Sequence, residues 1–280
     1  MSLNQLLFTD IHCHIIPCID DGSANLSEST LMAKKALEDG TTSLIATPHQ
    51  LGTNSRVSVE SIKHGLALLR EELRKQEIHV EVLPGADVRI DPELPKLLKQ
   101  GKVLTLADRG KHVLLELPHE TYYPLEQLLK SLRKQGLVGI LSHPERNRGI
   151  IKNPDVMWDV IEAGGLLQIT AASLTGAFGS SCQEIAELAV DEGLIHFIAS
   201  DAHDTKHRPF GMRDAYDTIC DMAGEKLANL VCCENPARVF EGDDVRGGLV
   251  GQTERRSTKK RTKHRTKQRK GFGFGWFDRS

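Results

Sequence analysis

The chain has 280 residues, of which 39% are apolar and 26% charged, with a formal net charge of −2, as is usual for a globular protein. No apolar run reaches the ~18–20 residues of a membrane-spanning helix, and the N-terminal residues lack the basic and apolar regions of a secretory signal. We therefore expect a cytoplasmic protein, neither membrane-spanning nor secreted, whose six cysteines are reduced.

Seven short runs of nearly continuous apolar character predict strands that are buried on both faces. They are Leu6–Ile11, Ser43–Thr47, Val80–Pro84, Val113–Leu117, Val138–Leu141, Leu166–Thr170 and Ile195–Ala199.

Amphipathic segments lie between the predicted strands and predict helices. These segments are Leu26–Asp39, Val57–Gln76, Pro124–Gln135, Asp155–Ala163, Cys182–Asp191 and Met212–Ala223. Glycines at positions 40, 136, 164 and 193 stand where helix C-caps belong. This alternation predicts a parallel α/β architecture.

The C-terminal segment differs from the rest of the chain in charge. Residues 251–280 carry 11 Lys/Arg and 2 Asp/Glu, a net of +9, whereas the other 250 residues carry 25 and 36, a net of −11. With so few aliphatic residues, the segment cannot bury enough apolar area to offset the entropy of ordering it. We expect a folded domain over residues 1–244 and a disordered basic tail over residues 245–280.

Metal-binding side chains stand at the C-terminal ends of six of the seven predicted strands. Residues i and i+2 of an extended chain point to the same side, so His12 and His14 can reach one ion, as can Asp201 and His203. The nine candidate ligands are His12, His14, Asp21, His49, Asp87, Glu116, His143, Asp201 and His203. Catalytic residues of α/β barrels gather at this end of the strands. The pattern therefore favours a closed or nearly closed barrel over an open sheet.

This mixture of imidazoles and carboxylates suits a class of divalent metals but does not identify one of them. It suits Mn²⁺, Fe²⁺ or Zn²⁺, and nine ligands are too many for one ion, so two or three ions are expected. The carboxylates have an alternative role, because acidic residues at strand ends also cap helices.

Four other histidines stand away from the strand ends. His79, His112 and His196 begin strands at the opposite end, and His64 lies within a helix, so we expect surface or capping roles for all four. His119 stays unassigned.

Two arginines accompany the candidate ligands. Arg146 follows His143 by three residues, and Arg208 follows His203 by five. A guanidinium group binds phosphate oxygens through two parallel hydrogen bonds, although a surface or ion-paired role is the alternative. Arg148 and His207 are weaker candidates of the same kind. Metals beside arginines predict a phosphate-ester substrate, since metals lower the pKa of a bridging water and hold phosphoryl oxygens.

At these residues the sequence resembles the polymerase-and-histidinol-phosphatase (PHP) superfamily. Within it, the chain looks like the bacterial protein-tyrosine phosphatases associated with capsule and exopolysaccharide synthesis. The resemblance extends over about Phe8–Phe240, and the matching stretches are DIHCHIIPCIDDG, ATPH, GAD, LLELP, SHPERN, ASDAH and RPFGM.

The resemblance implies a distorted (β/α)₇ barrel that prefers Mn²⁺, with up to three ions. It implies phosphate-binding roles for Arg146 and Arg208, and a phosphotyrosine substrate in the tail of a membrane-bound tyrosine autokinase. It also implies metal ligands at His12, His14, Asp21, His49, Glu116, His143, Asp201 and His203. Asp87 departs from the pattern, since this branch usually has Glu there, which puts the occupancy of one metal in question. Asp201, His203 or His207 are the candidates to protonate the leaving phenolate.

Three alternatives remain open. The same metal site suits a phosphatase of small molecules such as histidinol phosphate or a nucleoside phosphate. Cys232 and Arg238 have the spacing of a cysteine-dependent phosphatase, but the segment between them lacks glycine, and Pro236 removes one backbone amide. The basic tail suits an anionic membrane surface, which would place the protein at the inner membrane face, better than it suits nucleic acid. A solvated tail without a specific partner is the further alternative.

Overall fold

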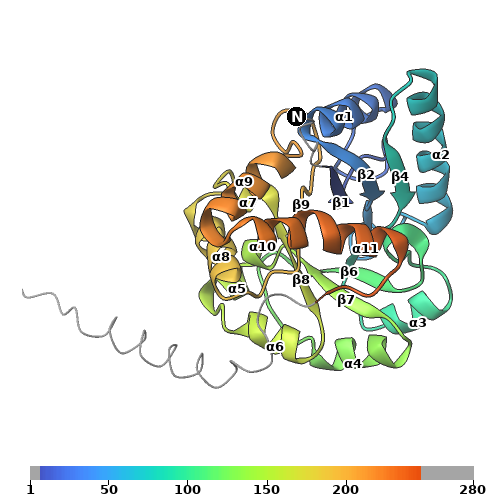
Figure 1. Ribbon diagram of the computed structural model, residues 1–280. Coiled ribbons are helices and arrows are strands. Elements are labelled where there is room, and N and C mark those ends of the chain that lie inside the picture. The colour runs from blue at the N-terminus through green and yellow to red at the C-terminus, as the bar shows by residue number, and fades with distance from the viewer. Residues whose placement is uncertain (1–6, 247–280) are drawn as a thin grey trace, which may run out of the picture.

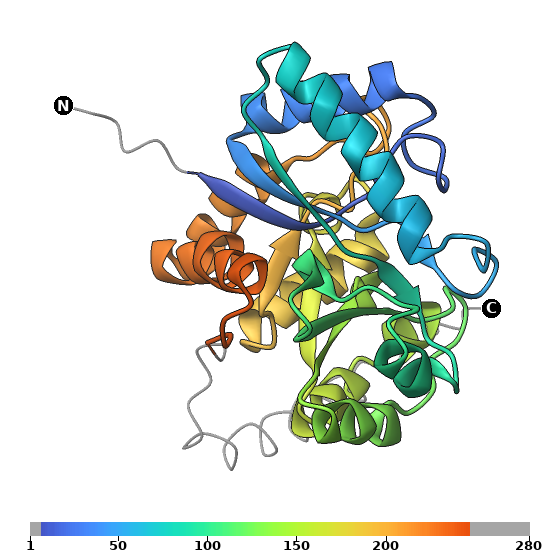
Figure 2. The same ribbon diagram turned by 90° about the vertical axis from the view of Figure 1, so that its right-hand side faces the viewer.

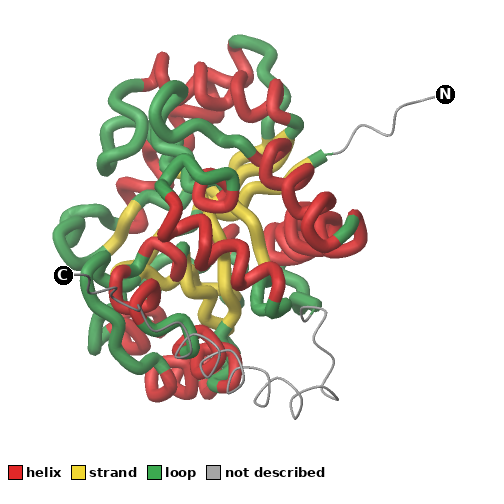
Figure 3. The backbone as a smooth tube through the Cα atoms, turned by 90° about the vertical axis from the view of Figure 1, so that its left-hand side faces the viewer, coloured by secondary structure: helices red, strands yellow, loops and turns green. Residues whose placement is uncertain are grey.

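The computed structural model describes residues 7–246. Parallel strands occupy the centre and helices surround them (Figures 1 and 3). The strands are β1 (Phe8–Cys13), β2 (Thr41–Ala46), β3 (His49–Gln50), β4 (Glu81–Pro84), β5 (Asp87–Arg89), β6 (His112–Glu116), β7 (Val138–Ser142), β8 (Leu166–Thr170) and β9 (Phe197–Ala199). The seven predicted strands are all present, and β3 and β5 are two short additions.

The two additional strands continue their predecessors after a break. The hydrogen-bonded orders are β1-β2-β4 and β3-β5-β6-β7-β8-β9, with every pair parallel. Pro48, which has no N–H, stands in the break between β2 and β3. Gly85 stands in the break after β4, where a Cβ would lie 2.7 Å from Ile45 Cγ2. Two strands of the barrel are therefore interrupted: β2 continues as β3 and β4 continues as β5, each passing from the first sheet to the second. Counted in this way, the barrel has seven strands that are arranged in chain order.

Hydrogen bonds between the ends of β9 and β1 close the barrel. Asp201 N donates to His12 O, and His14 N donates to Ala202 O, both at 2.8 Å. The buried carboxylate of Asp10 also joins the two strands, because its Oδ1 accepts from Ser200 N at 3.0 Å and from His12 N at 3.1 Å. The predicted distorted (β/α)₇ barrel is confirmed.

The helices cover the outside of the barrel (Figure 2). They are α1 (Leu26–Asp39), α2 (Val59–Lys75), α3 (Leu94–Lys99), α4 (Glu126–Lys134), α5 (Arg148–Lys152), α6 (Val156–Glu162), α7 (Ala171–Leu174), α8 (Ser180–Asp191), α9 (Met212–Ala223), α10 (Glu225–Asn229) and α11 (Asn235–Glu241). The helix α1 has its predicted bounds because both ends are capped. Asn25 Oδ1 accepts from Glu28 N at 3.0 Å, and Gly40 ends the helix in the left-handed conformation.

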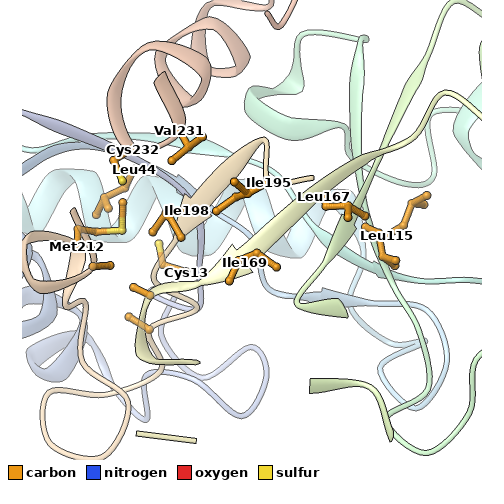
Figure 4. Packing of buried hydrophobic residues seen from close by; sticks show 14 of the residues in the cluster. Cys13, Leu44, Leu115, Leu167, Ile169, Ile195, Ile198, Met212, Val231 and Cys232 are labelled. Atoms are coloured by element: carbon orange, nitrogen blue, oxygen red, sulfur yellow. The ribbon is translucent and has the colours of Figure 1, made fainter. Parts of the chain in front are cut away.

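Apolar side chains form two layers of core. The outer layer lies between strands and helices, and Figure 4 shows part of it, including Ile169, Ile198 and Val231. The inner layer includes Ile11, Leu114, Ile140 and Phe197 from the strands. It also includes Leu106 and Ala107 from the short helix η1 (Leu106–Asp108), and Val239 and Phe240 from α11. The chain after α9 therefore helps to close the end of the barrel at which the strands begin.

This closure contradicts a surface role for His112 and His196, which was one of the two roles predicted for them. Both are buried, and burial lowers the pKa of each to about 4. Asn235 of α11 donates to His196 O at 3.1 Å, and Lys111 pairs with Asp244 at 2.8 Å. The prediction of a surface role was wrong because α11 and the residues after it cover these strand ends, and nothing in the local sequence indicates that contact.

The predicted disordered tail, residues 245–280, lies almost wholly outside the described residues. Within residues 7–246, no helix is both long enough and apolar enough to cross a membrane. All six cysteines are free.

Candidate metal centre

The carboxyl ends of the strands bring all nine predicted ligands together. Four groups of potential ligand atoms form, and within each group all atoms lie within 4.8 Å of one another. The groups are His14, Asp21, His49 and His203; His12, His14 and Asp87; His12, His143 and Asp201; and His49, Asp87 and Glu116. Because the groups share His12, His14, His49 and Asp87, they form one continuous cluster.

His12, His14 and Asp201 form a tightly packed group at the end of β1. His12 Nε2 lies 3.2 Å from His14 Nε2 and 3.3 Å from Asp201 Oδ1. The distance from His14 Nε2 to the same carboxylate oxygen is 3.4 Å. All three side chains are buried, so they would surround an ion with protein and exclude water from that side of it.

Asp87 links this part of the cluster to His49 and Glu116. Its Oδ2 lies 3.3 Å from His49 Nδ1 and 3.7 Å from His12 Nε2. His49 Nδ1 is also 3.5 Å from Glu116 Oε2, and its Nε2 is 3.4 Å from Asp21 Oδ1. Although Asp is shorter than Glu by one methylene, the carboxylate of Asp87 reaches the imidazoles on both sides.

Two residues that the sequence analysis did not single out orient these imidazoles. Asp20 Oδ2 lies 2.7 Å from His14 Nδ1, and Gln168 Oε1 lies 2.9 Å from His12 Nδ1. Such partners fix the ring and its tautomer so that the other nitrogen faces the metal. The Asp-Asp-Gly motif was a usable signal for Asp20, whereas Gln168 lies within β8 and has none.

Gly22 completes the loop that carries Asp20 and Asp21. A Cβ at this position would lie 2.2 Å from His14 O and 2.5 Å from His14 Cβ. Gly22 N also donates to Asp20 Oδ1 at 3.1 Å. Only glycine lets the loop lie this close to His14.

Replacing Gly22 with Ala is therefore expected to displace both aspartates and to weaken Mn²⁺ binding about 10- to 100-fold, as measured by calorimetric titration of metal-free protein. The control is Gly136→Ala. Its Cβ meets nothing within 4 Å, but φ is +76°, so it should cost about 1 kcal/mol of stability and leave Mn²⁺ affinity unchanged. Unchanged affinity in Gly22→Ala would contradict this role for the loop.

Burial and the dense mixture of charges shift several pKa values. Burial opposes protonation of His14, but Asp20 and Asp201 outweigh it and raise its pKa to about 10. Burial, with the neighbouring Asp87, raises the pKa of Glu116 to about 7, and burial lowers that of His143 to about 3. Burial also opposes ionisation of Asp201, yet His12, His14 and Arg208 hold its pKa well below the usual range. His143 is thus held neutral and Asp201 ionised, which are the forms in which an imidazole and a carboxylate bind a metal.

The cluster fits divalent cations. Among the described residues, His49 Nδ1, Asp87 Oδ2 and His203 Nε2 are buried polar atoms without a hydrogen-bond partner. Buried polar atoms are seldom left so, and these three are an imidazole–carboxylate set of the kind that binds Mn²⁺, Fe²⁺ or Zn²⁺. Two candidate ligands also have unusual backbones, since φ is +32° at His143 and +52° at Asp201. Such strain is concentrated at functional sites.

A cleft of about 420 Å³ opens over the cluster. Arg146 and Arg208 line it, and both donate to Asp201 Oδ2, Arg208 at 2.6 Å. The two predicted phosphate-binding side chains therefore meet beside the ligands, with their remaining N–H groups available to a phosphoryl oxygen. Of the weaker candidates, Arg148 is exposed and pairs with Glu120 at 2.9 Å, and His207 is exposed and does not line the cleft. His119, which the sequence left unassigned, does line it.

Phe178, between α7 and α8, lies against both arginines. Its ring centroid is 4.3 Å from Arg146 Cζ and 5.9 Å from Arg208 Cζ. An aromatic face attracts a cation without offering an acceptor that competes with phosphate.

Replacing Phe178 with Leu should raise KM about fivefold, since exposed and half-buried cation–π contacts contribute about 1 kcal/mol, and should leave kcat nearly unchanged. Phe178→Tyr serves as the control because it keeps the aromatic face. Steady-state kinetics measures both values, and equal KM in the Leu and Tyr variants would reject the contact.

The cysteine-dependent alternative is wrong for Cys232. The side chain is fully buried, and burial raises the pKa of its thiol well above the usual range. It lies in the π-helical turn η3 (Leu230–Glu234) within the outer core and not in a phosphate-binding loop. A buried, protonated thiol is a poor nucleophile.

Comparisons with known proteins agree with this geometry. The family model for capsular polysaccharide synthesis proteins of the CpsB/CapC type matches residues 8–241. The chain is 38% identical to the tyrosine-protein phosphatase YwqE of Bacillus subtilis over 220 residues, which is 78% of this chain and 86% of that protein. It is 25% identical to the tyrosine-protein phosphatase CpsB of Streptococcus pneumoniae over 237 residues, 82% of this chain and 97% of that one.

Solved structures extend the comparison to the fold. One structure, from work on YwqE of Bacillus subtilis and CpsB of Streptococcus pneumoniae as metal-dependent tyrosine phosphatases, aligns with a TM-score of 0.82 and 32% identity. The alignment covers 87% of this chain and 100% of that one. The phosphotriesterase homology protein of Escherichia coli aligns with a TM-score of 0.55 at 12% identity over 85% of this chain and 100% of that one, a likeness of fold alone.

Proposed function

Because the chain belongs to the CpsB/CapC family of capsular polysaccharide synthesis proteins, we propose that it is a metal-dependent protein-tyrosine phosphatase. Nine metal-binding side chains form one cluster beneath the cleft that Arg146 and Arg208 line, and this arrangement is the main support for the proposal. Imidazoles and carboxylates supply the metal sites, and the arginines supply the phosphate site. The relatives named above favour this activity over hydrolysis of small-molecule phosphates.

The four overlapping ligand groups suit two or three ions, with Mn²⁺ as the proposed metal. We assign one ion to His12, His143 and Asp201, and a second to His14, Asp21, His49 and His203. His49, Asp87 and Glu116 would hold a third. Asp87 Oδ2 lies within 3.9 Å of the imidazoles of His12, His49 and His143, so its carboxylate would help to hold the ions despite its shorter side chain.

The chain's own residues bind and orient the phosphate ester. Bound divalent ions supply Lewis-acid stabilisation of phosphoryl oxygens and lower the pKa of water. Arg146 and Arg208, held together by Asp201, bind the non-bridging oxygens and stabilise charge that develops on them. Asp201 stays ionised because its pKa is low, so it aligns the arginines and donates no proton. His203 is assigned to metal binding, and a tyrosine phenolate, with a pKa of about 10, leaves with little acid assistance.

We place the substrate phosphotyrosine in the tail of a membrane-bound tyrosine kinase that acts in polysaccharide synthesis, on the cytoplasmic side. The 11 basic residues of positions 251–280 support contact with an anionic membrane or another acidic partner. Sedimentation of full-length protein with anionic vesicles, but not with neutral ones, at low salt would support the contact. Equal sedimentation with both would contradict it.

The substrate class is tested by comparing turnover in the presence of Mn²⁺. The proposal predicts that a phosphotyrosine peptide is hydrolysed with a kcat/KM at least about 100-fold above those of histidinol phosphate and a nucleoside monophosphate. A preference for either small molecule would favour the alternative function on the same site.

A further inference from the structure

Arg89 is a third arginine at the cleft, and the proposed function leaves it without a role. It lies on β5 two residues after Asp87, so both side chains point to the same side of the strand. It faces Glu116 in the register of β5 and β6, and its Nη2 lies 3.2 Å from Glu116 Oε2. The side chain is 30% exposed and lines the cleft. Arg89 thus lies beside the Glu116 part of the cluster, whereas Arg146 and Arg208 contact Asp201.

The loop after β3 holds Arg89 in place. Leu51 and Gly52 both have left-handed backbones, with φ of +68° and +56°, and the turn is closed by a bridge from Leu51 to Asn54. A Cβ at Gly52 would lie 2.8 Å from Arg89 Cγ. The backbone of the turn therefore packs on the aliphatic part of Arg89, so that binding a ligand costs this arginine little conformational entropy.

The charges around Arg89 indicate what this ligand is. The carboxylates that line the cleft are Asp21, Glu116 and Asp201, and all three belong to the proposed ligand groups. The other lining residues beyond the ligands and the two phosphate-binding arginines are Thr53, Asn54, Arg89, Leu117, His119, Ser142 and Asn147. No carboxylate among the lining residues is left over to neutralise Arg89 once the ligands hold cations. A negatively charged group is the complementary ligand.

We propose that Arg89, framed by Thr53 and Asn54, binds an anionic side chain next to the phosphotyrosine and so selects acidic peptide segments as substrates. This inference rests on the proposed function and deepens it. Arg89 is a specificity-determining residue in this account, because it contacts the substrate outside the phosphate. Its ion pair with Glu116 is shared with the metal site, so the test must separate selectivity from overall rate.

The experiment uses three phosphotyrosine peptides that differ only in the residue next to the phosphotyrosine, which is Glu, Gln or Lys. The full-length protein, saturated with Mn²⁺, should show a kcat/KM for the Glu peptide about five- to tenfold above that for the Lys peptide, as partly buried charge pairs provide. Arg89→Gln should abolish this ratio, and Arg89→Glu should invert it. The ratio within one variant is independent of any loss of rate through Glu116.

Arg74→Gln is the matched control. It removes the same charge from the far end of α2, where Arg74 is exposed and pairs with Glu71, and should keep the wild-type ratio. Hydrolysis of all three peptides at equal rates by the wild-type protein, or an unchanged ratio in Arg89→Gln, would overturn the role of Arg89 and leave the proposed function intact. Failure to hydrolyse any of the peptides would overturn the proposed function itself.

Discussion

Replacing Asp201 with Asn is expected to lower kcat/KM by a factor of at least about 1000, which corresponds to about 4 kcal/mol of transition-state stabilisation. The side chain is 2% exposed, and its Oδ1 lies within 3.4 Å of His12 Nε2 and His14 Nε2. Its Oδ2 accepts from Arg146 and Arg208. Asn keeps the shape but removes the charge, so one change weakens the metal site and releases both phosphate-binding arginines.

The control for this variant is Asp244→Asn. Asp244 also pairs with a basic side chain, that of Lys111 at 2.8 Å, but it is exposed and lies at the opposite end of the barrel. Wild-type kinetics are expected for it. Steady-state assays with a phosphotyrosine peptide and circular dichroism of all three proteins separate loss of the site from loss of the fold. Activity within about tenfold of wild type in Asp201→Asn would contradict the role given to this carboxylate.

Removal of divalent ions should abolish activity and addition of Mn²⁺ should restore it. The arginines alone bind phosphate but do not generate a nucleophile at neutral pH, so at least about 1000-fold of the rate is expected to depend on the metal. The assay compares chelator-treated, extensively dialysed protein before and after Mn²⁺ is added back. Persistent activity after dialysis, with the metal content verified as negligible, would exclude the proposed chemistry.

Removing the divalent ions should also lower the thermal stability of the protein. Binding an ion at 100 times its Kd stabilises the folded state by about 2.7 kcal/mol, and the clustered carboxylates of Asp21, Asp87, Glu116 and Asp201 make a cation-free site unfavourable. Thermal unfolding of protein with Mn²⁺ should therefore occur at a higher Tm than that of metal-free protein. Gly22→Ala should show a smaller increase in Tm because its ion affinity is lower.

The sequence predicts the part of this site that depends on strand ends. Short buried strands with a histidine or carboxylate immediately after them determine where those side chains lie, because parallel strands in a barrel end at the same face. His12 and His203 are 191 positions apart in the chain, yet both contribute to the candidate metal groups. The bounds of α1 and α9 were also predictable, since apolar periodicity and flanking glycines mark them.

Features that depend on tertiary packing were not predictable. Gln168 acts by facing His12, which is 156 positions away in the chain, and only the closed barrel brings this pair together. The breaks that separate β3 from β2 and β5 from β4 result from local close approaches. The burial of His112 and His196 depends on later parts of the chain that pack over the strand starts. In each case the determining partner is far away in the sequence or is fixed by a loop.

The number of bound ions per chain is the decisive test of the proposed metal centre. Full-length protein, saturated with Mn²⁺ and freed of unbound ions, should contain two or three ions per chain by elemental analysis, and Asp201→Asn should contain at least one fewer. Wild-type protein that retains no divalent ion under these conditions, while hydrolysing phosphotyrosine, would exclude metal-dependent hydrolysis at this site.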